Sequence, residues 1–571
     1  MTKDIHIVAA GAAGQGVETV AQVLAKTLAR AGFGVASERD YMSRVRGGHN
    51  FARIRVATET PWACEPRADL LIALTAESYD RHRDTLSPDA RIVHDPEAFA
   101  LPAGEDRGLA VHLNKLAREA GGAVMANTVA VGAALRALGL PTEHTRRILA
   151  ETFADKPGMP EKNAAALESG YEAAGAAGCT EACFLLPEAR YEGVERLYID
   201  GSSALGLAAL ASGCRFFSGY PMTPATGVMN YLAARQERHG IVVEQAEDEI
   251  AALNMVLGAS FAGLRSLTAT SGGGFALMVE ALSLAGITET PAVIILGMRP
   301  GPATGMATRT EQGDLLFALH AGHGEFPRAV LSAATLEGAF YGLNRAFDLA
   351  DRYQTPVIFL TDQHFNDSAR TIAPFDFDRL LYDRHLVDAG KLSSPYIRYP
   401  DAASGVSPRA LPGQHSGEIV LADSHEHDER GNISEDIDVR RQQMDKRLRK
   451  LAGIAGHMEE PLTVGPPEPE ILLLGWGSTY GVLRQVVTDL EAGGASVGLL
   501  HFTDLWPLPQ AKLEQAVAAA RLTISLEHNA TGQFAALLRS AAGVEPDHQI
   551  LKYDGRPFEP AEISREVLAR V

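Results

Sequence analysis

Cysteine is scarce in this sequence. The 571 residues include only four cysteines, Cys64, Cys179, Cys183 and Cys214. That number is too small for a disulfide framework. An iron–sulfur cluster usually needs four thiolates at close, patterned spacing, and here only Cys179 and Cys183 are near neighbours. We therefore expect unliganded thiols, and no metal centre or cluster on this chain.

Positive charge and long apolar runs are also in short supply. The chain has 52 lysines and arginines against 71 aspartates and glutamates, a formal net charge of −19, whereas a nucleic-acid-binding domain carries a basic face. No apolar run reaches the roughly 18 residues that a membrane-spanning helix needs, and the N-terminal sequence has no signal-peptide pattern. We expect no nucleic-acid partner, no membrane partner and a cytoplasmic location.

What the chain does have is a repeated alternation of short apolar strands and longer apolar-periodic helices. Its length exceeds what one core usually holds, and its 46% hydrophobic and 22% charged residues are ordinary for a globular protein. Composition changes divide it into three α/β domains, residues 1–188, 197–385 and 463–571, with a polar connector at 386–462. We predict an α/β fold, with a mainly parallel sheet in the first domain.

The predicted elements follow from apolar runs and their periodicity. The 250–263 helix is apolar on nearly all sides, which predicts burial, and the basic 440–450 helix is interpreted as a solvated face. The remaining helix is predicted at 17–31, and strands are predicted at 5–10, 70–74, 90–93, 291–296, 356–360, 470–474, 497–500 and 522–526.

A glycine turn with Gly11, Gly14 and Gly16 lies between the first predicted strand and the first helix. Such a turn exposes backbone N–H groups and a helix N-terminus to an anion. Its spacing is GxxGxG rather than the GxGxxG of dinucleotide-binding folds, and the nearest later acid, Glu38, comes late. A plain tight turn, or a site for another phosphate-bearing ligand, is favoured over NAD.

The next glycine-rich segment, SRVRGGHN, begins at Ser43 and places Arg44 and Arg46 beside Gly47. Guanidinium groups next to freely bending backbone suit phosphate or carboxylate groups. The alternative is a surface turn with solvated arginines, and the segment alone favours that alternative.

A rigid loop follows a strand-like segment in the second predicted domain. Within GYPMTPAT, the residues Pro221 and Pro224 fix φ on either side of Thr223, which then presents a hydroxyl and an N–H in a set geometry. Tyr220 precedes this pair. The arrangement suits a small carboxylate, and a purely structural turn stays open.

Three acids, Glu247, Asp248 and Glu249, begin the apolar 250–263 helix. Acids at a helix start usually complement the helix dipole as caps. A carboxylate that leads into a buried helix can instead serve as a proton-handling group. The capping interpretation is the default, and the second stays open.

Two further polar segments come directly after predicted strands. The turn TATSGGG, residues 268–274, precedes an apolar helix and can therefore line a ligand site. Arg299 lies where the carboxyl ends of strands meet a crevice, and it is either a clamp for a substrate carboxylate or a salt-bridge partner. The 425–429 cluster HEHDE suits a closed tetrahedral metal site poorly, because its ligands are adjacent in a connector, and we favour a solvated loop.

Taken in order, these segments resemble the alpha chain of 2-oxoacid:ferredoxin oxidoreductases, with a gamma-type domain fused in front. GAAGQGVE and SRVRGGHN are similar to the gamma-domain signature, and YPMTPAT resembles the family's YPITP loop. EDEIAALNMVLGASFAG and TATSGGGFALM resemble its pyrimidine-binding domain. GWGS, WPLP and EHNATGQ are similar to its transketolase C-terminal-like domain. The resemblance covers nearly the whole chain and implies these three α/β domains.

The resemblance also assigns roles to particular residues. Glu249 matches the glutamate that hydrogen-bonds the aminopyrimidine of thiamine diphosphate, which makes it the implied catalytic residue. Ser271 and Gly272 match the cofactor-binding turn, and Thr223 and Arg299 match the groups that hold the substrate carboxylate. The resemblance also places Tyr220 and Pro221 beside the substrate. The gamma-type loops help to enclose coenzyme A, and their candidate residues are Gly14, Gly16, Ser43, Arg46 and Gly47.

The sequence lacks the GDG-then-Asn signature that holds the diphosphate through magnesium, and it lacks a cluster motif. The resemblance therefore implies a beta subunit that brings magnesium and a 4Fe–4S cluster, in a heterotetramer built as a dimer of heterodimers. The implied reaction is coenzyme A-dependent oxidative decarboxylation of a 2-oxoacid with reduction of ferredoxin, in either direction.

The gamma–alpha fusion order favours 2-oxoglutarate as the substrate, with succinyl-CoA as the product and a place in the TCA cycle. Its distal carboxylate needs a second cation, for which Arg44, Arg46 and Arg309 are candidates. Pyruvate and branched-chain 2-oxoacids are alternatives. A non-redox, transketolase-like thiamine enzyme is a second class, and it leaves residues 1–188 unexplained. A nucleotide-binding regulator depends only on the first glycine turn.

Overall fold

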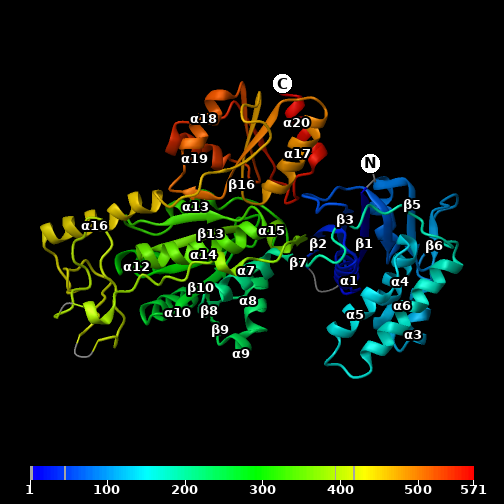
Figure 1. Ribbon diagram of the computed structural model, residues 1–571, viewed down its shortest axis with the longest axis horizontal. Helices are drawn as coiled ribbons and strands as arrows, with labels where there is room; N and C mark the ends of the chain where they lie inside the picture. The colour runs from blue at the N-terminus through cyan, green and yellow to red at the C-terminus, as the bar shows by residue number, and fades with distance from the viewer. Residues whose placement is uncertain (1–3, 44–46, 393, 416–417) are drawn as a thin grey trace. The chain divides into compact units, whose positions relative to one another are not determined.

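The computed structural model describes residues 4–43, 47–392, 394–415 and 418–571. These residues fall into two compact units, Met1–Asp200 with Asp367–Pro374, and Gly201–Asn366 with Phe375–Val571. The first unit is built on one sheet and the second on two, and helices cover the sheets (Figure 1). None of the described helices is long and apolar enough to cross a membrane.

The first unit is built on a mixed sheet. Parallel pairing joins β6, β5, β4 and β1, and antiparallel pairing joins β1, β3, β2, β14 and β7. The prediction of a mainly parallel sheet is wrong here, because the short connection from β2 to β3 permits only antiparallel pairing. In spatial order the strands are β6 (Gly108–Ala110), β5 (Leu86–His94), β4 (Ala68–Ala73), β1 (Ile5–Ala12), β3 (His49–Ala57), β2 (Gly34–Asp40), β14 (Ala369–Ile372) and β7 (Leu197–Asp200).

The helices of the first unit bury apolar faces. In α1, Val20, Leu24 and Leu28 recur every four residues and are fully buried, which is the spacing that packs one helix face against a core. The predicted 17–31 helix is thereby confirmed. The helices are α1 (Val17–Arg30), α2 (Ala76–His82), α3 (Leu113–Glu119), α4 (Ala126–Leu138), α5 (Glu143–Thr152) and α6 (Met159–Ala176).

The larger sheet of the second unit is parallel except for one edge strand, β18. Every residue of β10, β11 and β13 is buried, as is typical of parallel strands covered on both faces. The predicted strands at 291–296 and 356–360 are confirmed as β11 and β13. The spatial order is β18 (Asp504–Trp506), β12 (Ala329–Ser332), β13 (Pro356–Asp362), β11 (Ala292–Met298), β10 (Arg265–Thr270), β8 (Cys214–Gly219) and β9 (Val242–Gln245).

The helices associated with this sheet come from a long stretch of the chain. They are α7 (Gly201–Ala211), α8 (Thr226–Ala233), α9 (Gln236–His239), α10 (Glu249–Phe261), α11 (Gly272–Leu277), α12 (Val279–Ile287), α13 (Leu315–His320), α14 (Leu336–Tyr353), α15 (Gln363–Asp367) and α16 (Ile437–Ala455).

The smaller sheet of the second unit confirms the predicted C-terminal strands at 470–474, 497–500 and 522–526. It is parallel apart from β15. Its strands, in spatial order, are β15 (Leu462–Val464), β17 (Val497–Phe502), β16 (Ile471–Trp476), β19 (Leu522–Glu527) and β20 (His548–Leu551). Its helices are α17 (Tyr480–Ala492), α18 (Ala511–Ala519), α19 (Gln533–Ala542) and α20 (Pro560–Leu568).

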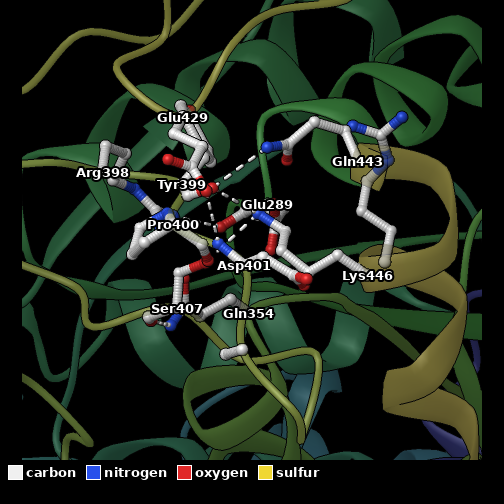
Figure 2. Close-up of polar contacts among 12 residues, drawn as sticks. Glu289, Gln354, Arg398, Tyr399, Pro400, Asp401, Ser407, Glu429, Gln443 and Lys446 are labelled. Carbon is white, nitrogen blue, oxygen red and sulfur yellow. Dashed lines mark hydrogen bonds and ion pairs between the residues drawn. The ribbon is translucent and has the colours of Figure 1, made fainter. Parts of the chain in front are cut away.

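The basic helix α16 is not a solvated face, which corrects the prediction. Lys446, Arg447 and Lys450 are buried at 0–2% exposure. The ammonium groups of Lys446 and Lys450 lie 2.7 and 2.6 Å from the two carboxylate oxygens of Glu289, which is itself fully buried. Figure 2 shows Lys446 facing Glu289 among residues of the 398–407 segment. Charge pairing, and not amphipathicity, fixes this helix to the core.

Gln312 ties the loop after β11 to the smaller sheet. Its side-chain amide donates to the carbonyl of Trp476 at 2.9 Å and accepts from the backbone N–H of His528 at 2.9 Å. Its backbone N–H donates to the carbonyl of His528, and its own carbonyl accepts from the Asn529 amide at 3.2 Å. Gln312 is fully buried, so these bonds are shielded from water.

Replacing Gln312 by Ala is expected to lower the free energy of unfolding by about 1–3 kcal/mol, because the buried N–H of His528 loses its acceptor. Urea unfolding of the purified protein measures this. The control is Gln510→Ala, since Gln510 is exposed and, among the described residues, its side-chain amide forms one surface bond, to the carbonyl of Ala541. Equal stability of the two variants would contradict the prediction.

Candidate functional site

Three neighbouring parallel strands bring the candidate residues to one edge of the larger sheet. β8 pairs with β10, and β10 pairs with β11, all in parallel. The loop at 219–226 follows β8, the turn at 271–274 follows β10, and Arg299 follows β11. The carboxyl ends of adjacent parallel strands are where open α/β sheets form ligand crevices.

Arg299 and Thr223 are in direct contact. The guanidinium Nη1 of Arg299 donates to the backbone carbonyl of Thr223 at 2.6 Å. Among the described residues this is its one hydrogen bond, and none of them forms an ion pair with Arg299 within 4 Å. Burial lowers the pKa of Arg299, and the charge of Asp314 opposes that effect. The remaining N–H groups of Arg299 are available to a carboxylate, which favours the clamp over the salt-bridge interpretation.

The residues around this pair divide by exposure. Tyr220 is 40% exposed and Pro221 is exposed, so both present surface at the mouth of the loop. Ser271 is fully buried, and its hydroxyl donates to the sulfur of Met222 at 2.6 Å. The structure thus joins the 219–226 loop to the 271–274 turn.

Glu249 occupies the first turn of α10 and is only 3% exposed. The capping role belongs to its neighbour, because the carboxylate of Asp248 accepts from the N–H of Ala251 at 2.8 Å. The Oε1 atom of Glu249 has no hydrogen-bond partner among the described residues. A buried carboxylate oxygen is normally paired, so this one calls for a donor from outside the described chain.

The glycine turn leaves room for the Glu249 carboxylate. A Cβ atom placed on Gly274 would collide with Oε1 of Glu249 and with the Thr270 hydroxyl. On the other side of the turn, a Cβ on Gly272 would lie 2.5 Å from Oδ2 of Asp314. Asp314 is not among the residues predicted from the sequence, where its only signal is an acid before a short helix.

The prediction that α10 is buried on nearly all sides is wrong. Ile250 is 48% exposed and Met255 is 41% exposed, and Asn254 and Gly258 are exposed on the same face. Ile250, Asn254 and Gly258 recur every four residues and Met255 lies beside them, so these positions form one face of the helix. An apolar helix face beside Glu249 is therefore open in this chain.

The first unit contains a cavity of about 400 Å³ at the glycine turn. Gly14 and Gly16 line it together with Tyr41 and Asn50. Gly16 has φ 75° and precedes the first residue of α1, a left-handed conformation that glycine adopts readily. Arg39 also lines it, but its guanidinium already pairs with Glu18 and Asp367. Ser43 is exposed and Gly47 has φ 75°, and neither lines the cavity, whereas Arg44 and Arg46 lie outside the described residues.

Two interpretations of polar clusters need correction. The structure pairs Cys179 with Cys183 as a disulfide, so free thiols remain only at Cys64 and Cys214 among the described residues. The 425–429 segment is not a solvated loop throughout, since His427 is fully buried. Within it, the carboxylate of Glu426 accepts from the guanidinium of Arg447 at 2.7 and 3.0 Å.

Known protein families match three successive parts of the chain. Residues 6–173 match the family described as "pyruvate ferredoxin/flavodoxin oxidoreductase". Residues 207–446 match its "thiamine diP-bdg" domain, and residues 469–563 match "pyruvate:ferredoxin oxidoreductase core domain II".

A 2-oxoacid:ferredoxin oxidoreductase subunit alpha from Sulfolobus is 30% identical over 620 aligned positions, which cover 98% of this chain and 95% of the relative. The chain belongs to the alpha subunits of the 2-oxoacid:ferredoxin oxidoreductases. Among solved structures, the 2-oxoglutarate:ferredoxin oxidoreductase of Magnetococcus marinus, with 2-oxoglutarate, coenzyme A and succinyl-CoA bound, resembles this alpha subunit with a TM-score of 0.91. The two are 30% identical, and the likeness covers 100% of both chains.

A further relative of this alpha subunit is the 2-oxoglutarate oxidoreductase subunit KorA of Mycobacterium tuberculosis. It is 28% identical, and the alignment covers 98% of this chain and 90% of that one. The resemblance and the α/β fold class are confirmed, and the alpha subunit is part of an oxidoreductase that acts on 2-oxoacids.

Proposed function

We propose that this alpha subunit catalyses, with a beta subunit, the oxidative decarboxylation of 2-oxoglutarate. The substrates are 2-oxoglutarate, coenzyme A and oxidised ferredoxin, and the products are succinyl-CoA, carbon dioxide and reduced ferredoxin. One observation carries the proposal. Arg299 donates to the Thr223 carbonyl and keeps further N–H groups without a described partner, and it lies at the same sheet edge as the buried Glu249, whose Oε1 has no described partner. One group suits a substrate carboxylate, and the other suits an N–H donor on the ring of the cofactor's aminopyrimidine.

The residues around Glu249 fit the aminopyrimidine of thiamine diphosphate. Its orphaned Oε1 is a buried acceptor, and the missing side chains of Gly272 and Gly274 keep the adjacent turn open. When bound, thiamine diphosphate supplies the electron sink that allows a 2-oxoacid to lose carbon dioxide. In this proposal Glu249 would accept a hydrogen bond from the pyrimidine ring and thereby set the protonation state of the ring. Ser271 and Gly272 would line the ring.

The substrate carboxylate is assigned to Arg299, with the 220–223 segment alongside. A guanidinium group presents parallel N–H donors that match the two oxygens of a carboxylate, and Thr223 orients it through the 2.6 Å bond. Tyr220 and Pro221, both exposed, border the entrance.

The choice of 2-oxoglutarate is supported by the relatives that carry this substrate in their names. A cation for its distal carboxylate is not assigned. Arg309 is buried and donates to the carbonyl of Thr308, and Arg44 and Arg46 lie outside the described residues. Pyruvate and branched-chain 2-oxoacids are the competing substrates.

Coenzyme A is assigned to the gamma-type loops of the first unit. The cavity of about 400 Å³ at Gly14 and Gly16 supports this, as does the Magnetococcus relative, whose structure holds coenzyme A. The open backbone at these glycines suits a phosphate-bearing ligand. Ser43, Arg46 and Gly47 are retained as candidates from the sequence.

A beta subunit is assigned to the open face of α10. Ile250 and Met255 expose apolar surface there, directly beside Glu249, and solvent-exposed apolar faces mark interaction sites. The beta subunit is proposed to supply magnesium, the diphosphate site and a 4Fe–4S cluster, since only two of the four cysteines of this chain, Cys179 and Cys183, are near neighbours in the sequence. The assembly is proposed to be a dimer of heterodimers. Within it, this chain contributes the proposed domains 1–188, 197–385 and 463–571 and the connector 386–462.

The experiment that tests the function is a reconstitution. The chain is purified with and without its genomic neighbour, and 2-oxoacid-dependent, coenzyme A-dependent reduction of a one-electron dye is measured. We expect activity only with the neighbour, highest with 2-oxoglutarate among 2-oxoglutarate, pyruvate and branched-chain 2-oxoacids. A stable complex with thiamine diphosphate and the cluster, but without activity on any 2-oxoacid, would overturn the proposal.

Replacing Arg299 by Met is expected to raise KM for the 2-oxoacid by about 10- to 100-fold, because a charge-assisted hydrogen-bonded pair contributes about 1.5–3 kcal/mol. Arg299→Lys keeps the charge but loses the fork, and it should recover only part of the affinity. Initial rates of the reconstituted complex measure both. An unchanged KM in the Met variant would place the carboxylate elsewhere.

A further inference from the structure

Asp314 stands at the start of α13, in the position where an aspartate usually caps a helix. Its side chain does not do so. Instead, Oε1 of Gln533 accepts from the N–H of Leu316 at 3.0 Å, and Nε2 of Gln533 donates to the carbonyl of Gly313 at 2.7 Å. The neutral side chain of Gln533 on α19 therefore caps α13, and the carboxylate of Asp314 makes no capping hydrogen bond.

The carboxylate of Asp314 lies against the proposed cofactor turn. The position of a Cβ on Gly272 is 2.5 Å from Oδ2 of Asp314 and 2.8 Å from Oδ1. The same turn contacts Glu249 through Gly274. Two carboxylates from the starts of different helices thus flank one glycine turn, and the charges of Asp314 and Arg299 act on each other.

The surroundings of Asp314 favour a change of its protonation state near neutral pH. Burial raises its pKa to about 6, although the positive charge of Arg299 acts in the opposite direction. No described residue donates a hydrogen bond to this carboxylate. The charged groups that face it are Arg299, from the segment after β11, and Glu311 on the loop, whose own pKa is raised by burial and by Asp314. α11 and α19 contribute only the neutral Gly272 and Gln533.

We propose that Asp314 determines the affinity of the Arg299 site, because the substrate carboxylate binds to Arg299 together with a proton on Asp314. The inference rests on the proposed function. An ionised Asp314 offsets the charge of Arg299 and repels a second carboxylate, whereas a protonated Asp314 does neither. One proton is taken from solvent when the 2-oxoacid binds. It returns to solvent after the C1 carboxylate has left as carbon dioxide, since the opposing charge is then gone.

The test is the pH dependence of KM in the reconstituted complex of this chain and its beta subunit. Initial rates with 2-oxoglutarate and with pyruvate are measured from pH 5.5 to 8.5. With the wild type we expect a nearly constant KM below about pH 6 and a rise of up to about tenfold per pH unit above it, because one proton is linked to binding. The value of kcat should not follow this rise.

Asp314→Asn cannot ionise, so its KM should not show the rise, and at pH 8 it should fall below that of the wild type. Asp314→Ser should likewise show no rise of KM with pH, and it replaces the Asn variant in the test if that variant does not fold. Glu311→Gln is the matched control on the same loop and should keep the rise. A merely structural role for Asp314 would change stability or kcat, but it would leave the slope of KM against pH intact.

Calorimetry gives a second readout without turnover. Binding of 2-oxoglutarate in two buffers of different ionisation enthalpy at pH 7.5 should show uptake of about one proton in the wild type and none in Asp314→Asn. If the wild type turns over a 2-oxoacid and both proteins show the same slope and proton uptake, the inference is overturned and the proposed function stands. If the wild type neither binds nor turns over any 2-oxoacid, both are overturned.

Discussion

Glu249→Gln is expected to lower kcat of the reconstituted enzyme by about 10²- to 10⁴-fold, the range that a positioned proton-handling group contributes. The amide keeps the size of the carboxylate but loses its charge and presents an N–H₂ group on one side. Because Oε1 of Glu249 has no partner among the described residues, the substitution breaks no bond within the described fold. Stability should therefore stay close to that of the wild type.

The measurement is steady-state dye reduction, together with a thermal unfolding curve of the variant. Glu247→Gln is the matched control, since Glu247 is an exposed acid two residues away at the same helix start. It should retain full activity. A Glu249→Gln enzyme with wild-type kcat would show that Glu249 handles no proton, and the cofactor assignment would then have to be abandoned.

Glu289→Gln is expected to destabilise the second unit by about 3–5 kcal/mol, the usual cost of removing one partner from a buried ion pair. The substitution leaves Lys446 and Lys450 buried without a carboxylate. This is a large fraction of the 5–15 kcal/mol that stabilises a typical folded protein.

The charges in this cluster are strongly coupled. Burial raises the pKa of Glu289, but the ammonium groups of Lys450 and Lys446 outweigh it, and the net pKa is well below the usual range. Burial lowers the pKa of Lys450 to about 8, against the opposing charge of Glu289. Lys446 also donates to the carbonyl of Tyr399 at 3.3 Å, and Figure 2 shows the two residues together. Without the Glu289 carboxylate, Lys446 and Lys450 of α16 lose their ion pairs, and the packing of α16 against the 398–407 segment is weakened.

Limited proteolysis of the 380–436 region and urea unfolding measure this effect. The control is Arg539→Gln, because the Arg539–Glu545 pair is exposed on both sides, 64% and 72%, and such pairs contribute about 0–1 kcal/mol. We expect faster cleavage and a lower unfolding midpoint only for Glu289→Gln. Equal behaviour of the two variants would show that the buried cluster is not what holds α16.

Five strands of the second unit, β11, β13, β16, β17 and β19, could be read from the sequence because all of their residues are buried. Runs such as 291–296 and 356–360 are continuously apolar, and this pattern is specific to covered parallel strands. The topology of the first sheet could not be read in the same way. Strand direction depends on which strands pair, and β14 enters that sheet from more than 150 residues away in the sequence.

The sequence by itself determined the family, and it singled out the candidate site residues that the proposal uses. Thr223, Glu249 and Arg299 follow strands or begin a helix, so local spacing is enough to single them out. The tertiary structure alone decided which side chains lack partners. Asp314 turns from its helix toward Gly272 because Gln533, more than 200 residues later, takes its place at the helix end. One face of α16 is buried and one face of α10 is open for the same reason: burial depends on which distant surface covers a helix, and local composition does not encode it.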